Sequence, residues 1–513
     1  MDERESDDES KNCVSSYFNP SWTECVENCR INTMKYEKCC GGPKHTLPVG
    51  SDAGDYFKLL FTNDMCEKIR ENTNKYAEFV HSATLNEWEP TGNKKWRWNP
   101  VTDIADLFNF IAIILIMGIN KQPRVQDYWS SDPILGNEQV KLTMTRRRFL
   151  EIYKFFHLSD RENEISKDDL SFYMMQKLDP FMTCLRSNFQ KYFEPYTHLS
   201  VDEAMVKYKG RLGIVQYMPN KPVKRGIKVW TLCTSFFGYV YNFEPYCGKK
   251  DKLPRSENGL GYSVVTFLTE NLSKGHHLYI DRFYSSVVLM KDLFHHGTYA
   301  TGTVNTNRKF LPPKLNKVKL VTNGSSKCFQ CVEEPNLTCT VWKDKKEIFL
   351  LSNGVKNEIT SVKRRIGGNV CYVTCPKAIA EYNKHMGGVD LADQNRKYVK
   401  DSEMLYRTTF YNKSTGETLS APLKKSRLKE NVVPRIFPGC PTFSIRESPS
   451  KKRQRLEQVQ IERSIIESLN SKQNYDSKTA FTFSFLLFLY FFLLYSFWTI
   501  IEKNENVIHP PIC

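Results

Sequence analysis

Three aspartates lie at the predicted ends of strands or within a predicted helix. Their side chains are the strongest candidates in the sequence for a chemical role. Asp202 ends an apolar-alternating run that starts at Leu199, and Asp281 follows the short apolar run at 277–280, so both are expected at strand ends. Asp390 lies in a helical pattern, and Asp393 follows three residues later on the same helix face. Carboxylates in such positions are well placed to hold divalent metal ions.

These aspartates predict a particular reaction. Separated carboxylates can surround two divalent cations, Mg²⁺ or Mn²⁺, about 4 Å apart, which is the geometry of in-line phosphodiester cleavage. One cation would activate the attacking water or 3′-hydroxyl, and the other would stabilise the leaving oxygen. Alternatives stay open: any one aspartate can have a surface or capping role, other acids such as Asp179 or Asp292 compete, and Gly387-Gly388 could break the helix before Asp390.

The segment after Asp202 is strongly basic. A dense positive field beside a carboxylate is expected where a polyanion binds. The chain of 513 residues carries a formal net charge of +16, which favours nucleic acid or an anionic membrane surface as partner, although a merely soluble basic protein would look similar. The cations of this segment are Lys207, Lys209, Arg211, Lys221, Lys224, Arg225 and Lys228.

The N-terminal part that precedes these residues is predicted to be helical. Apolar spacing over 55–80 predicts two short helices, the second capped by Asn63 or Asp64. The run 105–117 is apolar almost all round but too short to cross a bilayer, so we expect a central core helix. Thr145 is expected to cap a further helix whose first residues either grip phosphate or form a solvated basic face. These residues are Arg146, Arg147 and Arg148.

The chain divides into six predicted regions, and the alternation of strands and helices after 198 predicts a mixed α/β fold. An acidic, disordered tail (1–51) precedes a helical domain (52–197). The catalytic domain is expected at 198–304 and 371–400, interrupted by a β-rich insertion at 305–370 in which 342–352 is the clearest strand. A basic, disordered tail (401–479) and a hydrophobic segment (480–501) follow.

Two features of the C-terminal part bear on localisation. The segment 480–501 has no charged residue and is long enough for a transmembrane helix, which would make the protein tail-anchored. The competing interpretation is a translated piece of non-coding sequence with no selected role. The basic runs at 424–427 and 451–455 are either nuclear-import signals or parts of a charged tail.

Cysteine pairs raise the question of zinc. Cys328 and Cys331 form a CxxC, and Cys371 and Cys375 form a looser pair. Neither pair has histidines at the spacing of a zinc site, so zinc is not expected.

The sequence resembles the piggyBac transposases and the cellular proteins derived from them. The motifs occur in order between about Asp55 and Lys400: YWSSDP, MTRRRFLEIYKFFHLSD, SVDEAM, YMPNKPVKRGIKVW, YIDRFYSS, VWKDKKEIFLLS and YNKHMGGVDLADQ. The resemblance implies a helical dimerisation and DNA-binding domain and an RNase H-like catalytic core split by a β-rich insertion. It also implies a nuclear, magnesium-dependent cut-and-paste reaction on double-stranded DNA at TTAA sites, carried out by a homodimer.

Matched position by position, the family's catalytic aspartates fall on Asp202, Asp281 and Asp390, and its accessory metal ligand falls on Asp393. The chain departs from the family pattern after Asp393, where neither a tryptophan-bearing closing segment nor a cysteine- and histidine-rich zinc module is visible. We therefore expect weak or absent catalysis in this chain. The alternatives are a non-catalytic DNA- or chromatin-binding protein and a tail-anchored membrane protein.

Overall fold

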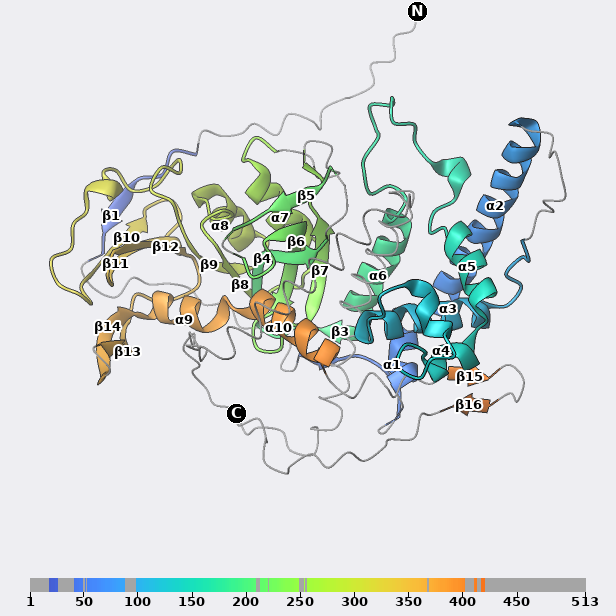
Figure 1. Cartoon of the computed structure of the whole chain (residues 1–513). Coiled ribbons are helices and arrows are strands. Elements are labelled where there is room, and N and C mark those ends of the chain that lie inside the picture. Colours follow the sequence, from blue (N-terminus) through green and yellow to red (C-terminus); the bar gives the residue numbers. More distant parts are fainter. Residues whose placement is uncertain are drawn as a thin grey trace, which may run out of the picture. The chain divides into compact units, whose positions relative to one another are not determined.

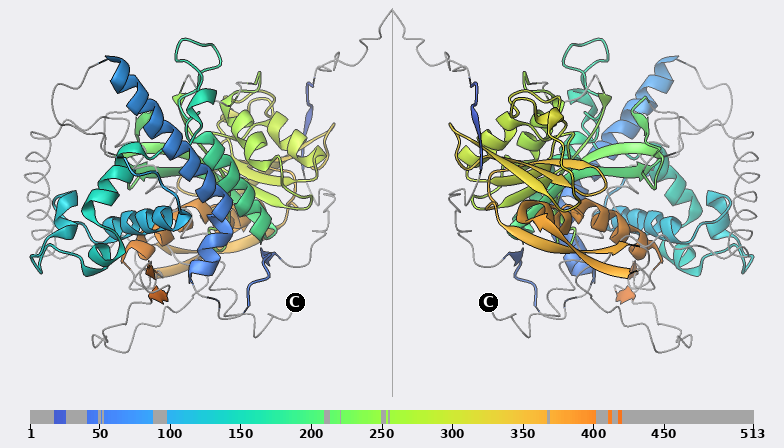
Figure 2. Two further views of the ribbon diagram at one scale, coloured as in Figure 1. Left: turned by 90° about the vertical axis from the view of Figure 1, so that its right-hand side faces the viewer. Right: turned by 90° about the vertical axis from the view of Figure 1, so that its left-hand side faces the viewer.

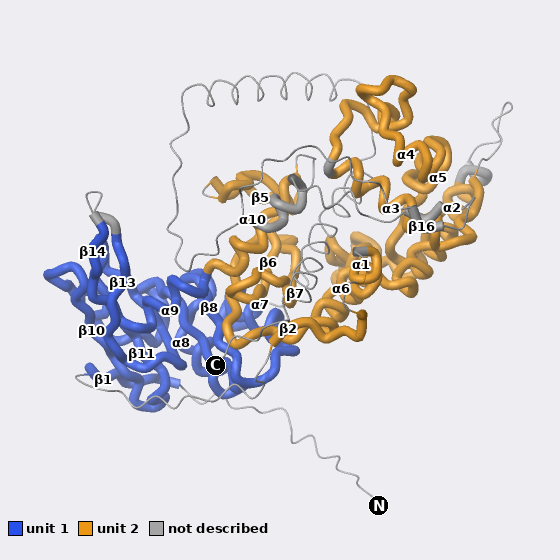
Figure 3. Tube along the Cα trace, turned by 90° about the horizontal axis from the view of Figure 1, so that it is seen from below, with its two compact units in different colours: residues 1–39, 255–386 blue, residues 40–254, 387–513 orange. Residues whose placement is uncertain are grey.

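The computed structural model describes residues 18–25, 41–48, 51, 53–87, 98–208, 213–219, 221–248, 253, 256–366, 369–401, 410–412 and 417–419. The chain forms two compact units (Figure 3). Unit 1 combines residues 1–39 and 255–386, and unit 2 combines residues 40–254 and 387–513. Each unit is described by itself below.

The N-terminal part of unit 2 is helical, as predicted. Its helices are α1 (Ala53–Leu60), α2 (Asn63–Glu87), α3 (Ile104–Ile119), α4 (Glu138–Thr143), α5 (Arg146–Phe155) and α6 (Asp179–Tyr192), with 3₁₀ turns η1 (Val125–Trp129) and η2 (Arg161–Asn163). The long helix α2 packs against α3 and α5, and α1 packs against α6 (Figure 2). The apolar run predicted as a core helix is α3, where Leu107, Phe110 and Ile113 are at most 1% exposed.

The helix caps of this region follow the sequence with one correction. The Thr145 hydroxyl accepts a hydrogen bond from the Arg148 backbone N–H at 3.3 Å, so the predicted cap of α5 is confirmed. Helix α2 is capped by neither Asn63 nor Asp64, because both already lie within it, and it is much longer than predicted. The hydroxyl of Thr62 accepts from the backbone N–H of Met65 at 3.3 Å and caps the helix instead.

The β-structure of unit 2 is an antiparallel meander around the longest strands. β4 (His198–Lys207) pairs with β6 (Arg225–Thr234) from Leu199↔Thr234 to Lys207↔Gly226, while β5 (Val215–Tyr217) and β7 (Val240–Pro245) also pair with β6. The predicted hairpin turn at Gly238 is present, and this glycine has a φ of 66°. The short strands β2 (Gly42–Pro43) and β3 (Phe193–Glu194) pair with each other.

Asp202 does not end its strand, which corrects the prediction. The ladder of β4 continues through Asp202↔Thr231 to Lys207. An acidic residue in a strand pattern predicts that the strand ends there and the chain turns to solvent. Here Lys221 and Lys228 neutralise Asp202 and Glu203, so the strand pairing continues past them.

Helix α10 (Gly388–Asp401) lies beside β4 and β6 (Figure 1). The predicted helix over 376–395 is therefore two helices: α9 (Lys377–His385) ends before Gly387, and α10 begins at Gly388. The glycine pair separates two helices and leaves Asp390 and Asp393 together on α10.

Unit 1 contains a parallel strand pair followed by an antiparallel meander. In chain order it has α7 (Leu260–Thr269), β8 (His277–Ile280), α8 (Val287–His295), β9 (Tyr299–Thr303) and the 3₁₀ turn η4 (Leu315–Lys317). β8 and β9 run parallel. β9 also pairs with β12 (Glu347–Ser352), which continues through β11 (Thr338–Lys343) and β10 (Ser326–Cys331) to β1 (Trp22–Glu24). A separate hairpin joins β13 (Ile359–Ile366) and β14 (Asn369–Pro376).

The β-rich character of 305–370 is therefore present, but the strand predicted over 342–352 is wrong in detail. Trp342 and Lys343 end β11, the chain turns at 344–346, and Glu347 begins β12. The fold is a mixed α/β arrangement, as predicted.

The C-terminal predictions fall mostly outside the described residues. Beyond α10 the structure describes only β15 (Phe410–Asn412) and β16 (Glu417–Leu419), which pair with each other. The hydrophobic segment 480–501 lies outside them. Of the helices in the described part of the chain, none combines the length and apolar character that crossing a bilayer requires.

Candidate active site and nucleic-acid interface

Asp202 is a mostly buried carboxylate with a lysine as counter-ion. Its side chain is 16% exposed, in the middle of β4. The Lys221 ammonium donates hydrogen bonds to Asp202 Oδ2 at 3.1 Å and to the backbone carbonyl of Glu203 at 3.2 Å. Burial raises the pKa of Asp202 to about 7, although the positive charge of Lys221 acts in the opposite direction. The site therefore favours a cation next to this carboxylate.

The negative charge of Asp390 acts on the same lysine from α10, which packs closely against β4 and β6. A Cβ atom on Gly388 would lie 2.8 Å from the carbonyl oxygen of Thr234, so only glycine allows this approach. Burial lowers the pKa of Lys221, but the negative charges of Asp202, Asp390 and Glu203 outweigh burial and raise it. Lys221 is therefore bonded to Asp202 and is affected by the charge of Asp390 as well.

Asp393 lies on α10 three residues after Asp390. Its side chain is half-buried, whereas that of Asp390 is exposed. Both predicted acids of the 388–401 segment therefore belong to one helix, and the role of Asp393 as a metal ligand stays a prediction.

A second acid–base pair lies beside the first and was not singled out from the sequence. Lys228 Nζ is 3.1 Å from Glu203 Oε1 and 3.8 Å from the centre of the Trp230 ring. Burial acts to raise the pKa of Glu203, but the ion pair with Lys228 outweighs it and the pKa is lowered. The signal in the sequence was the acidic dipeptide on one predicted strand and lysine on the next, which antiparallel pairing brings together.

Asp281 follows β8, as the sequence predicted. Its Oδ1 accepts hydrogen bonds from the Thr303 hydroxyl at 3.0 Å and from the Arg282 backbone N–H at 2.6 Å. The carboxylate lines a cavity of about 530 Å³ together with polar side chains from β9, β12 and α9. Asp281 belongs to unit 1, whereas Asp202 and Asp390 belong to unit 2, so its place beside them stays a prediction.

Some of the predicted basic residues are exposed to solvent, and others form contacts within the protein. Arg146 and Arg147 are exposed at the start of α5, where Arg147 forms an ion pair with Glu151 at 2.9 Å. Arg148 instead turns inward to Asp106 at 3.0 Å. Lys207, Lys224 and Arg225 are exposed, while Lys209 and Arg211 lie outside the described residues.

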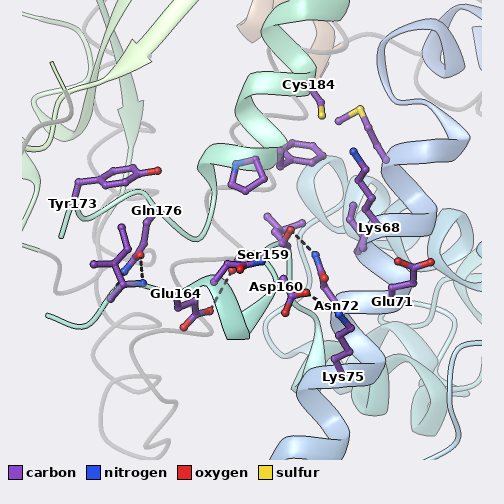
Figure 4. Close-up of a pocket in the computed structure, with 17 residues that line it drawn as sticks. Lys68, Glu71, Asn72, Lys75, Ser159, Asp160, Glu164, Tyr173, Gln176 and Cys184 are labelled. Atoms are coloured by element: carbon purple, nitrogen blue, oxygen red, sulfur yellow. Dashed lines mark hydrogen bonds and ion pairs between the residues drawn. The ribbon is translucent and has the colours of Figure 1, made fainter. Parts of the chain in front are cut away.

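A second cavity of about 440 Å³ lies in the helical part of unit 2, between α2, α6 and the segment after α5 (Figure 4). Its polar groups largely bond to the protein itself. Lys75 pairs with Asp160 at 2.7 Å, and the Asn72 amide donates to the Leu158 carbonyl at 3.1 Å. We assign no chemistry to this cavity.

Across the residues that the structure describes, no three or more His, Cys, Asp and Glu side chains form a group that could hold a metal ion. Burial raises the pKa values of the Cys328 and Cys331 thiols, so the thiolate forms that zinc requires are disfavoured.

Comparison with known proteins supports the predicted resemblance. A sequence profile described as Transposase IS4 matches residues 52–411. The human PiggyBac transposable element-derived protein 3 is 31% identical over 299 residues, which cover 56% of this chain and 48% of that protein. The human PiggyBac transposable element-derived protein 2 is 28% identical over 379 residues, covering 72% of this chain and 60% of that protein.

A solved structure shows the same fold. The piggyBac transposase in a cryo-EM synaptic complex with hairpin DNA superposes with a TM-score of 0.55 at 23% identity, covering 70% of each chain. The chain belongs to the Transposase IS4 family, and the predicted relationship to piggyBac transposases is confirmed. The chain spans about half the length of the first of these human relatives.

Proposed function

We propose that this chain binds double-stranded DNA and cleaves and transfers DNA strands at TTAA sites in a reaction that requires Mg²⁺ or Mn²⁺. The observation that carries the proposal is that Lys221 bonds Asp202 and also feels the negative charge of Asp390, so two of the aspartates act on one cation. Asp281 is the third catalytic residue of the proposal, and Asp393 is an accessory ligand.

The oxygen chemistry of these aspartates suits a divalent metal ion, although the described residues contain no preformed group of three or more such ligands. Carboxylate oxygens are the hard ligands that Mg²⁺ prefers, and the mostly buried Asp202 already requires a positive charge beside it. Asp202, Asp390 and Asp281 would hold the metal, with Asp393 in support. A bound divalent metal would stabilise the charge that develops on the attacking and leaving oxygens of a phosphodiester. The chain itself contributes the fixed position of Asp390 through α10 and the hydrogen bonds that orient Asp281.

Exposed cations support the DNA partner. Arg146 and Arg147 lie at the start of α5. Lys207 ends β4, Lys224 immediately precedes β6, and Arg225 begins β6. Phosphate groups are attracted to such positions regardless of base sequence. The solved piggyBac transposase, which shares this fold, is in a synaptic complex with hairpin DNA. A DNA substrate places the proposed activity in the nucleus, and a homodimer is the proposed assembly.

The experiment measures binding and cleavage separately. The full chain is incubated with a duplex carrying TTAA beside candidate terminal repeats, first in EDTA to measure binding and then in Mg²⁺ or Mn²⁺ to measure nicking. Asp202→Asn and Asp390→Asn test the site, and Asp168→Asn serves as a control because Asp168 is an exposed acid of the helical region. We expect at most weak nicking by the wild-type chain and the control, in line with the departures after Asp393, and none by the two site variants.

The other outcomes discriminate between functions. Binding without nicking by any protein would favour the alternative, a non-catalytic DNA- or chromatin-binding protein. Absence of binding at low salt would exclude both functions. A membrane-anchored protein would instead require that the full chain resist alkaline extraction from membranes.

A further inference from the structure

The two lysines beside the acidic dipeptide of β4 are held in different ways. Lys228 belongs to β6, pairs with Glu203 and packs over the Trp230 ring, so the sheet itself fixes it. Lys221 lies outside the ladder, in the connection between β5 and β6. Its backbone N–H donates to the Met218 carbonyl at 3.2 Å, which closes a turn. Its side chain is also more exposed than that of Lys228, at 23% against 13%.

The negative charges of Asp202, Asp390 and Glu203 act on Lys221, whereas Lys228 is affected by those of Glu203 and Asp202. Its ammonium contacts Asp202 directly, and the negative charge of Asp390 acts on it from α10. A divalent metal held by Asp202 and Asp390 would need the Asp202 oxygen that Lys221 contacts. A lysine ammonium and a metal ion cannot both occupy this point, because their positive charges repel one another.

We propose that Lys221 is the resident counter-ion of the Asp202–Asp390 site and that it must move away from Asp202 before a divalent cation binds there. This inference rests on the proposed metal-dependent function, because it concerns the same carboxylates. A turn-mounted, partly exposed side chain can leave without disturbing the β4–β6 ladder. Lys221 therefore stabilises the metal-free site and lowers its affinity for a divalent metal ion.

The test is the affinity of the full chain for Mn²⁺ alone, measured from the free-Mn²⁺ electron paramagnetic resonance signal at pH 8 without DNA. We expect Lys221→Met to bind Mn²⁺ at least about tenfold more tightly than the wild type, because the competing positive charge is gone. Lys221→Arg retains the charge and is expected to bind like the wild type. Lys228→Met is the matched control, because it removes a neighbouring lysine that contacts Glu203 rather than Asp202.

A second measurement guards against misfolding. Lys221→Met is expected to melt at a lower temperature than the wild type without metal and to recover more of that loss when Mn²⁺ is added. If Lys221→Met does not fold, Lys221→Gln is used instead, because it keeps a hydrogen-bond donor but removes the charge.

The outcomes separate this inference from the proposed function. Equal Mn²⁺ affinity in wild type, Lys221→Met and Lys221→Gln, with binding lost in Asp202→Asn, would overturn the counter-ion role and leave the metal site intact. No Mn²⁺ binding by any of these proteins would overturn the counter-ion role together with the metal site.

Discussion

Gly238 and Gly388 meet where the β6–β7 turn contacts the first turn of α10. A Cβ atom on Gly238 would lie 3.0 Å from the carbonyl oxygen of Gly388 and 2.7 Å from the backbone nitrogen of Ala392. The two backbones therefore approach as closely as residues without side chains permit. This contact fixes the height of α10 above the strands, and with it the position of Asp390.

Gly388→Ala should move α10 away from β4 and β6, because its methyl group would crowd Ser200 and the carbonyl oxygen of Thr234. A shift of about 1 Å at Asp390 is expected to lower metal-dependent cleavage by about a hundredfold. Gly387→Ala is the matched control, since a Cβ there meets nothing within 4 Å. Cleavage rates of the two variants decide the matter, and equal rates would contradict this role for Gly388.

The arginines of α5 should separate by function. Arg146→Ala and Arg147→Ala are each expected to weaken DNA binding and to reduce the slope of log affinity against log salt by about 1, because one phosphate contact is lost. Arg148→Ala should instead lower the unfolding temperature, because Arg148 bonds Asp106 and the carbonyls of Asn99 and Pro100. Fluorescence anisotropy over a salt series and thermal melting measure the two effects. Lys58→Ala, at an exposed lysine of α1, is expected to change neither, and a uniform effect of all four substitutions would argue against a phosphate contact on α5.

Thr303 should position Asp281 for metal binding. Its hydroxyl donates to Asp281 Oδ1 at 3.0 Å, so Thr303→Val removes the bond with little change in side-chain volume. The Mg²⁺ concentration for half-maximal cleavage is expected to rise about tenfold, as is usual for losses of ligand-orienting bonds. Thr303→Ser retains the hydroxyl and should restore the wild-type requirement. A Mg²⁺ titration that does not distinguish valine from serine would exclude the positioning role.

His157 should make the helical region less stable in mild acid. Burial lowers its pKa below 6.5 although Glu164, 2.9 Å away, acts to raise it, while Lys177 and Arg161 act to lower it. Because the unfolded chain binds the proton more readily, this contribution to stability is present at pH 7.5 and declines as pH falls below about 6.5. His157→Gln should therefore lose less stability between pH 7.5 and 5.5, by a difference in melting temperature on the order of 2 °C.

Thermal melting at the two pH values checks this expectation. The exposed His296 provides the control substitution, His296→Gln, whose melting should follow the wild-type pH dependence. A His157→Gln variant with an unchanged pH dependence would show that other groups control the acid sensitivity.

Asp281 could be placed from the sequence because local signals agree there. The strand before it, 277–280, is buried at every residue, and the chain leaves the strand directly at the carboxylate. Asp202 could not be placed in the same way. A charged residue inside a strand needs a counter-ion, and Lys221 lies 19 residues away across a turn that periodicity does not predict.

Two other features depended on long-range structure. The turn at 344–346 contains neither glycine nor proline, and Asp344 is its one residue of a type that favours turns, so the run 342–352 carried only a weak signal for its division between β11 and β12. Gly388 suggested a break within a helix, and it does mark the beginning of α10. Its second role, contact with the turn at Gly238, joins segments far apart in the sequence and has no local pattern.

The order in which the chain is synthesised adds a role for the paired strands β4 and β6. Asp202, Lys221 and their strands are complete once residue 234 has been made, whereas Asp390 comes from a helix that begins at Gly388. Because domains begin to fold while the rest of the chain is still being made, the β4–β6 strand pair can form well before α10 has been synthesised. During that interval Lys221 is the partner that allows Asp202 to be buried, so the half-built site is electrically balanced before the second aspartate exists.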